Sequence, residues 1–219
     1  MGASVRDNGI VIGVVSDLND PDRLGRVRVK FPHLQDTESD WARVVAPMAG
    51  KERGFYYRPE VGDEMLVLFE HGDPRRPYVV GGLWSVSQKP PADDGKHQEN
   101  NWRFIHSRSG HVLKFDDTKG KERIELIDKD QSRKIVIDCA GSKIHVQCDQ
   151  GDVEVESGSG NVSVKAPSGN VTIEAVNVEV KASGSMTLEA AAEMAIKGAT
   201  VNLEASGPMT IKGATVNIN

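Results

Sequence analysis

The sequence predicts an all-β protein, in which a small N-terminal barrel is followed by a thin, three-sided β-helix built by three intertwined chains. Three observations lead to this fold class. Short apolar alternations without a convincing helix occupy residues 10–85. A regular repeat of apolar pairs runs from Gly151 to Asn219, and no Phe, Trp or Tyr follows Phe115.

The C-terminal repeat consists of very short strands. One residue separates the two apolar members of each pair, so both side chains lie on the same face of a strand. Successive pairs begin seven to nine residues apart, and Gly, Ala, Ser and Asn cluster between them where the chain turns. This period is far shorter than those of helical solenoids and is typical of short-period β-helices. The pairs are Val153/Val155, Val162/Val164, Val171/Ile173, Val178/Val180, Met186/Leu188, Met194/Ile196, Val201/Leu203, Met209/Ile211 and Val216/Ile218.

The short period also predicts how the chain assembles. A strand with two inward side chains in about eight residues encloses a core only if the chain coils alone as a solenoid or shares the core with other copies. A single-chain solenoid usually has longer rungs, so we expect three chains to supply one face each. A narrow axis has room for Val, Ile, Leu and Met but little for aromatic rings, which fits their absence after Phe115. The predicted trimer core comprises Ile135, Ile137, Ile144 and Val146 together with the first eight pairs of the repeat.

The N-terminal strands predict a second fold. The alternation begins with Ile10, Ile12 and Val14, and further strands are expected at residues 25–31, 41–45, 64–69 and 78–83. About five strands within some 75 residues suggest a small closed barrel of the oligonucleotide/oligosaccharide-binding (OB) type. Most aromatic residues lie in this part of the chain, and we expect them in the barrel core.

These patterns divide the chain into five parts. Residues 86–101 are expected to form a linker, because they contain two prolines, paired carboxylates and a glycine. The strands beyond this linker lead into the repeat. The expected parts are an N-terminal arm (1–9), the OB barrel (10–85), a linker (86–101), transition strands that open the β-helix (102–150) and the triple-stranded β-helix (151–219).

Composition excludes several classes of function. No apolar run approaches the roughly 20 residues of a spanning helix, and the N-terminus lacks the apolar core of a signal peptide, so we expect synthesis in the cytoplasm. The net charge is −5, and from Gly151 onward four Lys face eight Asp and Glu, which disfavours nucleic-acid binding by the repeat.

Neither catalysis nor a metal site is expected. The adjacent carboxylates Asp93/Asp94 and Asp116/Asp117 lie in turn sequences, whereas glycoside cleavage needs two carboxylates held about 5–10 Å apart in a pocket. Ser109 lies in a polar turn without a nucleophile elbow. The protein is therefore expected to be no enzyme and to carry no cofactor.

The two cysteines favour a packing role. Cys139 and Cys148 share parity with the inward residues of their strands, so we expect small buried side chains, with a disulfide or a ring of thiols on the axis as the alternative. A metal site shared by His145 and Cys148 is disfavoured, because parity places His145 outward and Cys148 inward.

Several ordered motifs closely resemble the OB domain of VgrG spikes and of baseplate assembly protein V from contractile-tailed phages. Two more, at residues 108–111 and 115–124, resemble the segment that opens the β-helix of these spikes. The resemblance covers nearly the whole chain. The OB motifs are DPDRLGRVRVKFP (20–32), WARV (41–44), PEVGDE (59–64), FEHGDPRRP (69–77) and VGGL (80–83).

The resemblance implies a structural role. Such a protein is a homotrimeric central spike in the baseplate of a virion or contractile injection particle, attached to a hub at its N-terminal side and driven through the target cell envelope. Because the barrel begins by Ile10, a separate hub protein is expected. A PAAR-repeat tip protein is expected on the C-terminal end, at Val216, Asn217, Ile218 and Asn219. No His-x-His pair follows His145, so an intrinsic metal point is not expected.

Two alternatives stay open. The first is a spike with cell-wall hydrolase activity. The second is an OB module that binds an oligonucleotide or glycan through its basic residues, although few aromatic residues are interleaved with them in the sequence, so nucleic acid is not the expected partner. The basic residues concerned are Arg23, Arg26, Arg28, Lys30, Arg75 and Arg76.

Overall fold

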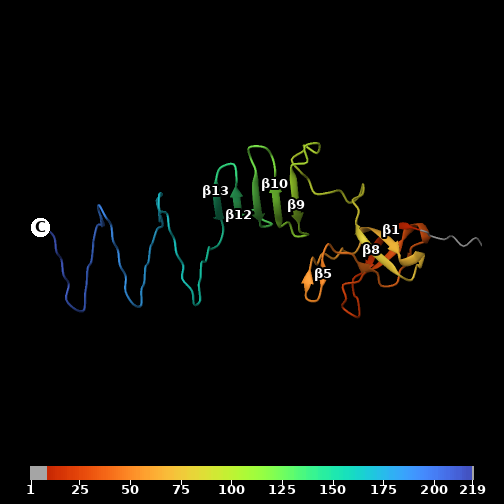
Figure 1. The fold of residues 1–219 in the computed structure, drawn as a ribbon, viewed down its shortest axis with the longest axis horizontal. Coiled ribbons are helices and arrows are strands. Elements are labelled where there is room, and N and C mark those ends of the chain that lie inside the picture. Colours follow the sequence, from red (N-terminus) through yellow and green to blue (C-terminus); the bar gives the residue numbers. More distant parts are fainter. Residues whose placement is uncertain (1–8, 219) are drawn as a thin grey trace, which may run out of the picture. The chain divides into compact units, whose positions relative to one another are not determined.

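A computed structural model describes residues 9–218 and divides the chain into two units, Met1–Glu154 and Val155–Asn219 (Figure 1). The expected N-terminal arm lies outside the described residues except for Gly9, and so does the terminal Asn219. Within residues 9–218, none of the helices has the length and apolar character that a membrane span requires.

The first unit begins with a six-stranded sheet in the order β3-β2-β1-β7-β8-β4. Neighbouring strands are antiparallel except for β4 and β8, which are parallel. Two short 3-10 turns, η1 (Pro32–Leu34) and η2 (Glu70–Gly72), follow β2 and β7. The strands are β1 (Ile10–Asp17), β2 (Arg28–Phe31), β3 (Thr37–Glu38), β4 (Arg43–Val44), β7 (Glu64–Phe69) and β8 (Pro77–Gly82).

This sheet closes on itself. The Val27 N–H donates to the Ala42 carbonyl at 3.0 Å and the Ala42 N–H donates back at 2.8 Å, which joins the start of β2 to the start of β4. The five barrel strands in chain order are β1, β2, β4, β7 and β8. The first pairs with the second and the fourth, and the third pairs in parallel with the fifth. This arrangement confirms the predicted five-stranded OB barrel.

The barrel core is built from valines rather than rings. Strand β1 contributes Val11 and Val15, whereas Ile10 and Ile12, with which the alternation in the sequence begins, lie on the outside. On β7, Val67 lies opposite Val11 and Met65 lies opposite Gly13, and both side chains are buried. The narrow interior takes a small side chain such as Val67 or an unbranched one such as Met65. The full core is Val11, Val15, Val27, Val29, Phe31, Ala42, Met65, Val67 and Val79.

Most aromatic side chains of this region lie outside the barrel, contrary to expectation. Phe31 is buried and Phe69 packs against the core, with ring centroids 5.6 Å apart. In contrast, Phe55, Tyr56, Tyr57 and Trp84 are exposed. The segment before them forms a small hairpin that the sequence analysis did not anticipate, made of β5 (Ala49–Gly50) and β6 (Arg53–Gly54).

A five-stranded antiparallel meander follows the linker. Its strands pair in chain order, each with the next, so the sheet needs no crossover. They are β9 (Trp102–His106), β10 (Val112–Asp116), β11 (Arg123–Ile127), β12 (Arg133–Asp138) and β13 (Lys143–Cys148).

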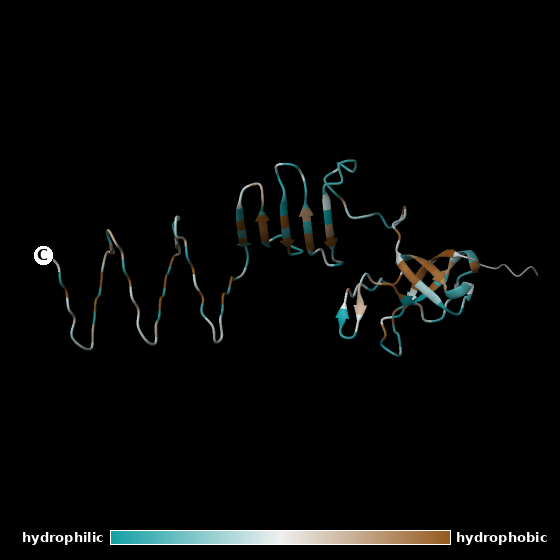
Figure 2. Ribbon diagram, viewed as in Figure 1, coloured by the Kyte–Doolittle hydropathy of each residue, from teal (hydrophilic) through white to brown (hydrophobic). Residues whose placement is uncertain are grey.

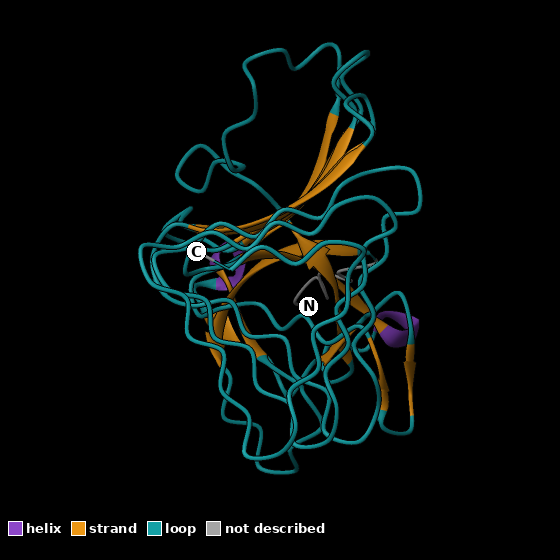
Figure 3. Ribbon diagram, turned by 90° about the vertical axis from the view of Figure 1, so that its left-hand side faces the viewer, coloured by secondary structure: helices purple, strands orange, loops and turns teal. Residues whose placement is uncertain are grey.

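The second unit has a different character. Residues 155–218 run as straight segments joined by bends, and Figures 1 and 3 draw them as loop throughout. Every described residue in this unit is exposed. Among these described residues there is one backbone–backbone hydrogen bond, in a turn where the Gly169 N–H donates to the Ala166 carbonyl at 3.3 Å.

Candidate functional site

The five-stranded sheet carries an uncovered apolar face. Ile135 lies opposite Val146 and Ile137 opposite Ile144, and the same face continues across the neighbouring strands. Figure 2 shows hydrophobic and hydrophilic residues alternating along these strands. Ile124 on this face is half-buried, and eight further large apolar side chains of the face are between 37% and 71% exposed. They are Ile105, Leu113, Phe115, Leu126, Ile135, Ile137, Ile144 and Val146.

The opposite face of the sheet carries charged side chains that pair with one another within the chain. Lys114 pairs with Glu125 and lies over the Trp102 ring, with its Nζ 4.2 Å from the ring centroid. Arg123 reaches Glu125 at 3.4 Å and Asp116 at 3.6 Å. Burial alone would raise the pKa of Asp116, but hydrogen bonds from Thr118 and the nearby cations outweigh it, so the pKa lies below its ordinary value. The charged side chains of this face thus pair with one another, although the buried Trp102 Nε1 has no hydrogen-bond partner in the single chain. The apolar side chains of the other face are left uncovered by the described residues.

The predicted core pairs of the repeat are exposed in the single chain, so the burial expected for them does not occur within one copy. The first member of each core pair is 48–61% exposed and the second is 64–77% exposed. The first members are Val153, Val162, Val171, Val178, Met186, Met194, Val201 and Met209. The second members, which differ most from the expected burial, are Val155, Val164, Ile173, Val180, Leu188, Ile196, Leu203 and Ile211.

The exposure of these pairs has a physical reason. Among the described residues of the repeat, no strand is hydrogen-bonded to a neighbour in its own chain, so no second layer covers the apolar side chains. Between Val178 and Val180, Glu179 points the other way by parity and forms an exposed ion pair with Lys181 at 2.7 Å. The place of these pairs in a trimer core stays a prediction.

Two stretches near the C-terminus nearly duplicate each other. MAIKGATVNL at 194–203 returns as MTIKGATVNI at 209–218, fifteen residues later. The turns match as well: a Cβ at Gly198 would lie 3.1 Å from the Thr200 carbonyl oxygen, and one at Gly213 would lie 3.2 Å from that of Thr215. Two strands and their turns thus form one repeating unit, and the last unit has the same local structure as the one before it.

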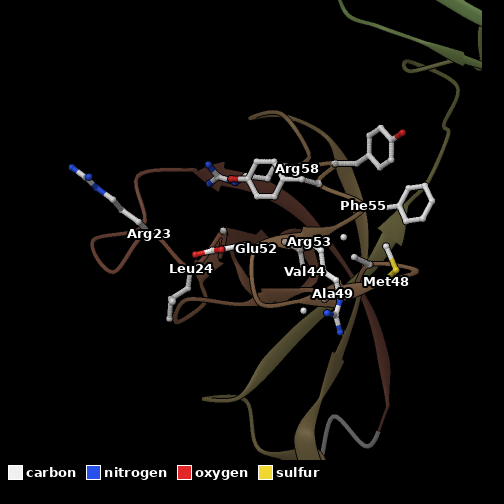
Figure 4. A pocket seen from close by; sticks show the side chains of 15 residues that line it. Arg23, Leu24, Val44, Met48, Ala49, Glu52, Arg53, Phe55 and Arg58 are labelled. Carbon is white, nitrogen blue, oxygen red and sulfur yellow. The ribbon is translucent and has the colours of Figure 1, made fainter.

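The barrel carries a separate exposed cluster, which we name the platform: Leu24, Met48, Phe55, Tyr56 and Tyr57. These side chains line a hollow of about 760 Å³ together with Arg23 and Arg53 (Figure 4). The rings of Phe55 and Tyr57 stack with centroids 6.2 Å apart. The sequence Phe55-Tyr56-Tyr57 indicates this surface, although the sequence analysis expects these aromatic residues in the barrel core.

A buried carboxylate holds the loop beside the platform. Asp20 accepts hydrogen bonds from the Leu24 N–H at 2.8 Å, the Arg26 N–H at 3.2 Å and the Arg26 guanidinium at 2.6 Å. The Arg26 side chain in particular holds the pKa of Asp20 well below its ordinary value. Arg58 donates to the Leu18 carbonyl at 2.6 Å and so ties the aromatic segment to the same loop.

Two glycines allow the close approach of these segments. Gly54 has a φ of +145°, and a Cβ there would lie 2.4 Å from the Met48 carbonyl oxygen. Gly25 has a φ of +74°, and its Cβ would touch the Tyr56 ring at 3.4 Å. Both positions favour glycine because other residues rarely adopt positive φ. The two glycines therefore let the backbone approach Met48 and Tyr56 of the platform closely.

Most of the basic residues considered for ligand binding are occupied by ion pairs. Arg26 pairs with Asp20 and Asp22, and Arg28 pairs with Glu38 at 3.0 Å. On the η2 side of the barrel, Arg75 pairs with Asp73 at 3.0 Å and Arg76 with Glu70 at 3.6 Å. Lys30 is exposed on β2. Of the six, only Arg23 lines the platform hollow.

The adjacent carboxylates point to different partners. Asp93 contacts His97 at 2.6 Å and Asp94 accepts from the Lys96 N–H at 2.9 Å. Asp116 lies near Arg123, whereas Asp117 pairs with Arg103 at 2.6 Å. Ser109 Oγ lies 3.3 Å from Ser107 Oγ, within its own turn as expected.

The cysteines and His145 lie apart. Cys139 is exposed and Cys148 half-buried, and both thiols are free in the single chain. His145 contacts Gln147 at 3.1 Å. Among residues 9–218, no three His, Cys, Asp or Glu side chains gather as a metal site would require. Burial of the two thiols on a trimer axis stays a prediction.

Comparison with known proteins assigns the barrel. Residues 11–84 match the type VI secretion system/phage-baseplate injector OB domain. The chain is a relative of VgrG-type spikes. It is 29% identical over 128 residues to the type VI secretion system spike protein VgrG1a of Pseudomonas aeruginosa, covering 53% of this chain and 20% of that protein.

Two VgrG relatives come from Vibrio cholerae. The type VI secretion system spike protein VgrG3 is 31% identical over 113 residues, which is 48% of this chain and 11% of the relative. The actin cross-linking toxin VgrG1 is 32% identical over 113 residues, or 48% of this chain and 10% of the relative. The chain thus spans about a tenth to a fifth of the length of these VgrG relatives.

Proposed function

We propose that this chain is the structural subunit of a trimeric spike in a contractile injection system. In this assembly three copies wrap residues 102–219 into one needle below their injector OB barrels. The observation that carries the proposal is the continuous series of exposed apolar side chains from Ile105 to Ile218, beside a barrel that is complete in itself.

Burial of these side chains supplies the driving force. Covering a Val, Leu, Ile or Met side chain fully contributes about 1.5–3 kcal/mol before the cost of ordering the chain. The extended backbone of residues 155–218 also needs partners for its N–H and C=O groups, which strands of neighbouring chains provide. One chain then cannot leave the needle without breaking its contacts with two others.

The needle suits a mechanical role. Interchain pairing leaves no long strand edge along the shaft, so compression is resisted by many backbone hydrogen bonds at once. The repeat has nine apolar pairs, each marking one strand. If each strand advances by one ladder spacing of about 4.8 Å, the repeat is roughly 40 Å long. The polar side chains between the pairs, such as Glu179 and Lys181, keep the outside soluble.

The expected partners lie at the two ends. A hub protein joins the barrel side, and a PAAR-repeat tip protein caps the C-terminal end at Val216, Asn217, Ile218 and Asn219. Val216 and Ile218 are exposed, and an open end of apolar side chains and unpaired strand edges requires a cap. Contraction of the machine would drive this spike through the target cell envelope.

A pair of deletions tests the tip. Removing Thr210 to Asn219 takes away the Val216/Ile218 pair and Ile211 of the preceding pair, so a co-expressed PAAR-repeat protein should no longer co-purify while the trimer survives. The matched control removes residues 194–208, one repeating unit, and leaves the end unit intact; this shorter spike should retain the tip protein. Binding of the tip protein by the chain without residues 210–219 would contradict the assignment.

A further inference from the structure

The platform has the composition of an interface centre. Interfaces are enriched in Tyr, Phe, Met and Arg, and these residue types meet here: Met48, Phe55, Tyr56 and Tyr57 beside Arg53. Tyr56 is 74% exposed, although its surroundings are held by the Asp20 and Arg58 hydrogen bonds. A surface that is already ordered loses little conformational freedom on binding. The platform is therefore suited to receive a partner segment.

Residues 84–94, which include the start of the linker, carry the apolar, proline and acidic side chains that could fill such a surface. Trp84 and Val86 are 72% and 93% exposed, and Pro90, Pro91 and Asp94 are exposed as well. Consecutive prolines favour the extended polyproline II conformation, which docks in aromatic-lined grooves. Asp93 and Asp94 at the end of this segment are opposite in charge to Arg23 and Arg53, which line the platform hollow together with Glu52.

Within one chain the linker is held elsewhere. The Gln88 side chain donates to the Gly62 carbonyl at 3.0 Å. Lys89 and Pro91 line a different hollow of about 460 Å³, with Asp63 and Glu64 of the barrel. No residue from 84 to 101 lines the platform hollow. The platform hollow is therefore not filled by residues 84–101 of its own chain, and docking of this segment on another copy would replace its Gln88 and Pro91 contacts.

We propose that the platform binds residues 84–94 of a neighbouring copy. Pro90 and Pro91 stack on the tyrosine rings, and Asp94 pairs with the arginine side of the hollow. This inference rests on the trimer proposed above. Undocked, this segment contacts its own barrel through the Gln88 hydrogen bond to Gly62 and does not tie one copy to another. Docked on a neighbour, it clamps the barrels to the needle, so force passes through without bending between them.

Photo-cross-linking of the full-length chain tests the clamp. Tyr57 is replaced by the photoreactive benzoylphenylalanine, the protein is irradiated, and the products are denatured and separated by mass. We expect species of twice and three times the chain mass, with cross-linked peptides that map to residues 84–94. Replacing Pro90 and Pro91 by Gly and Asp94 by Lys should lower the yield several-fold. The matched control carries benzoylphenylalanine at Asp36, an exposed barrel position outside the platform, and should not reach the linker.

The other outcomes separate this inference from the proposed function. A trimer that gives no interchain cross-link, or cross-links only outside residues 84–94, overturns the clamp and leaves the spike in place. A chain that sediments as a monomer overturns both. Saturable quenching of fluorescence by single-stranded oligothymidine, lost in Tyr56→Ala, would assign the platform to nucleic acid and would also overturn the clamp.

Discussion

The barrel and the C-terminal repeat are both rich in valine, yet only the barrel buries its valines. In the barrel, Val27, Val29, Val67 and Val79 are fully buried, because each strand finds its neighbours within the same chain. In the repeat, residues 155–218 stay exposed, since no strand of the same chain pairs with them among the described residues. Similar side chains thus serve autonomous folding in one region and assembly in the other.

The meander β9–β13 lies between these extremes. Its backbone is paired within the chain and the charged side chains of one face pair with one another, but its apolar face is uncovered. Along the chain, the cover that apolar side chains find within their own copy therefore decreases from the barrel to the repeat.

The largest effect is expected in the repeat. Val178→Asp places three carboxylates near the trimer axis, and each buried charge without a partner costs several kcal/mol. The variant should lose the trimer in light scattering after gel filtration, while the barrel keeps its fold. Glu179→Lys is the control, because residue 179 points to the other face, and it should remain trimeric. A trimeric Val178→Asp would show that this pair lies outside the core.

An intermediate effect is expected in the barrel. Val67→Ala removes part of a fully buried side chain and should lower the free energy of unfolding of the barrel by about 2 kcal/mol. Hydrogen exchange of β1 and β7 amides should accelerate while the mass of the assembly stays constant. Leu68→Ala, on the outer face of the same strand, should have a much smaller effect. Loss of the trimer in Val67→Ala would contradict the autonomy of the barrel.

The smallest effect is expected at Asp20. Its pKa lies below that of the unfolded chain, so its ionised form stabilises the fold above the ordinary pKa of 3.8, and this contribution is lost as the pH falls through the lower folded value. Asp20→Asn should lower the melting temperature of the barrel near neutral pH. The difference from the wild type should shrink in thermal scans below about pH 3. A constant difference at all pH values would exclude the ionic contribution.

The sequence allowed prediction of the elements better than of their faces. The strand at Glu64–Phe69 and the OB arrangement follow from alternation and turn residues. The inward side of β1 could not be predicted from parity, because apolar residues occupy both faces: Ile10 and Ile12 outside, Val11 and Val15 inside. The platform was missed because its parts, near Leu24 and at Phe55–Tyr57, meet only through loops held by Asp20 and Arg58.

The mass of the full-length chain in solution tests the central claim most directly. Sedimentation equilibrium is independent of shape, which matters for an elongated particle. The account predicts a single species at three times the chain mass of 23.8 kDa, unchanged over a wide range of concentration. A species at one chain mass would contradict it.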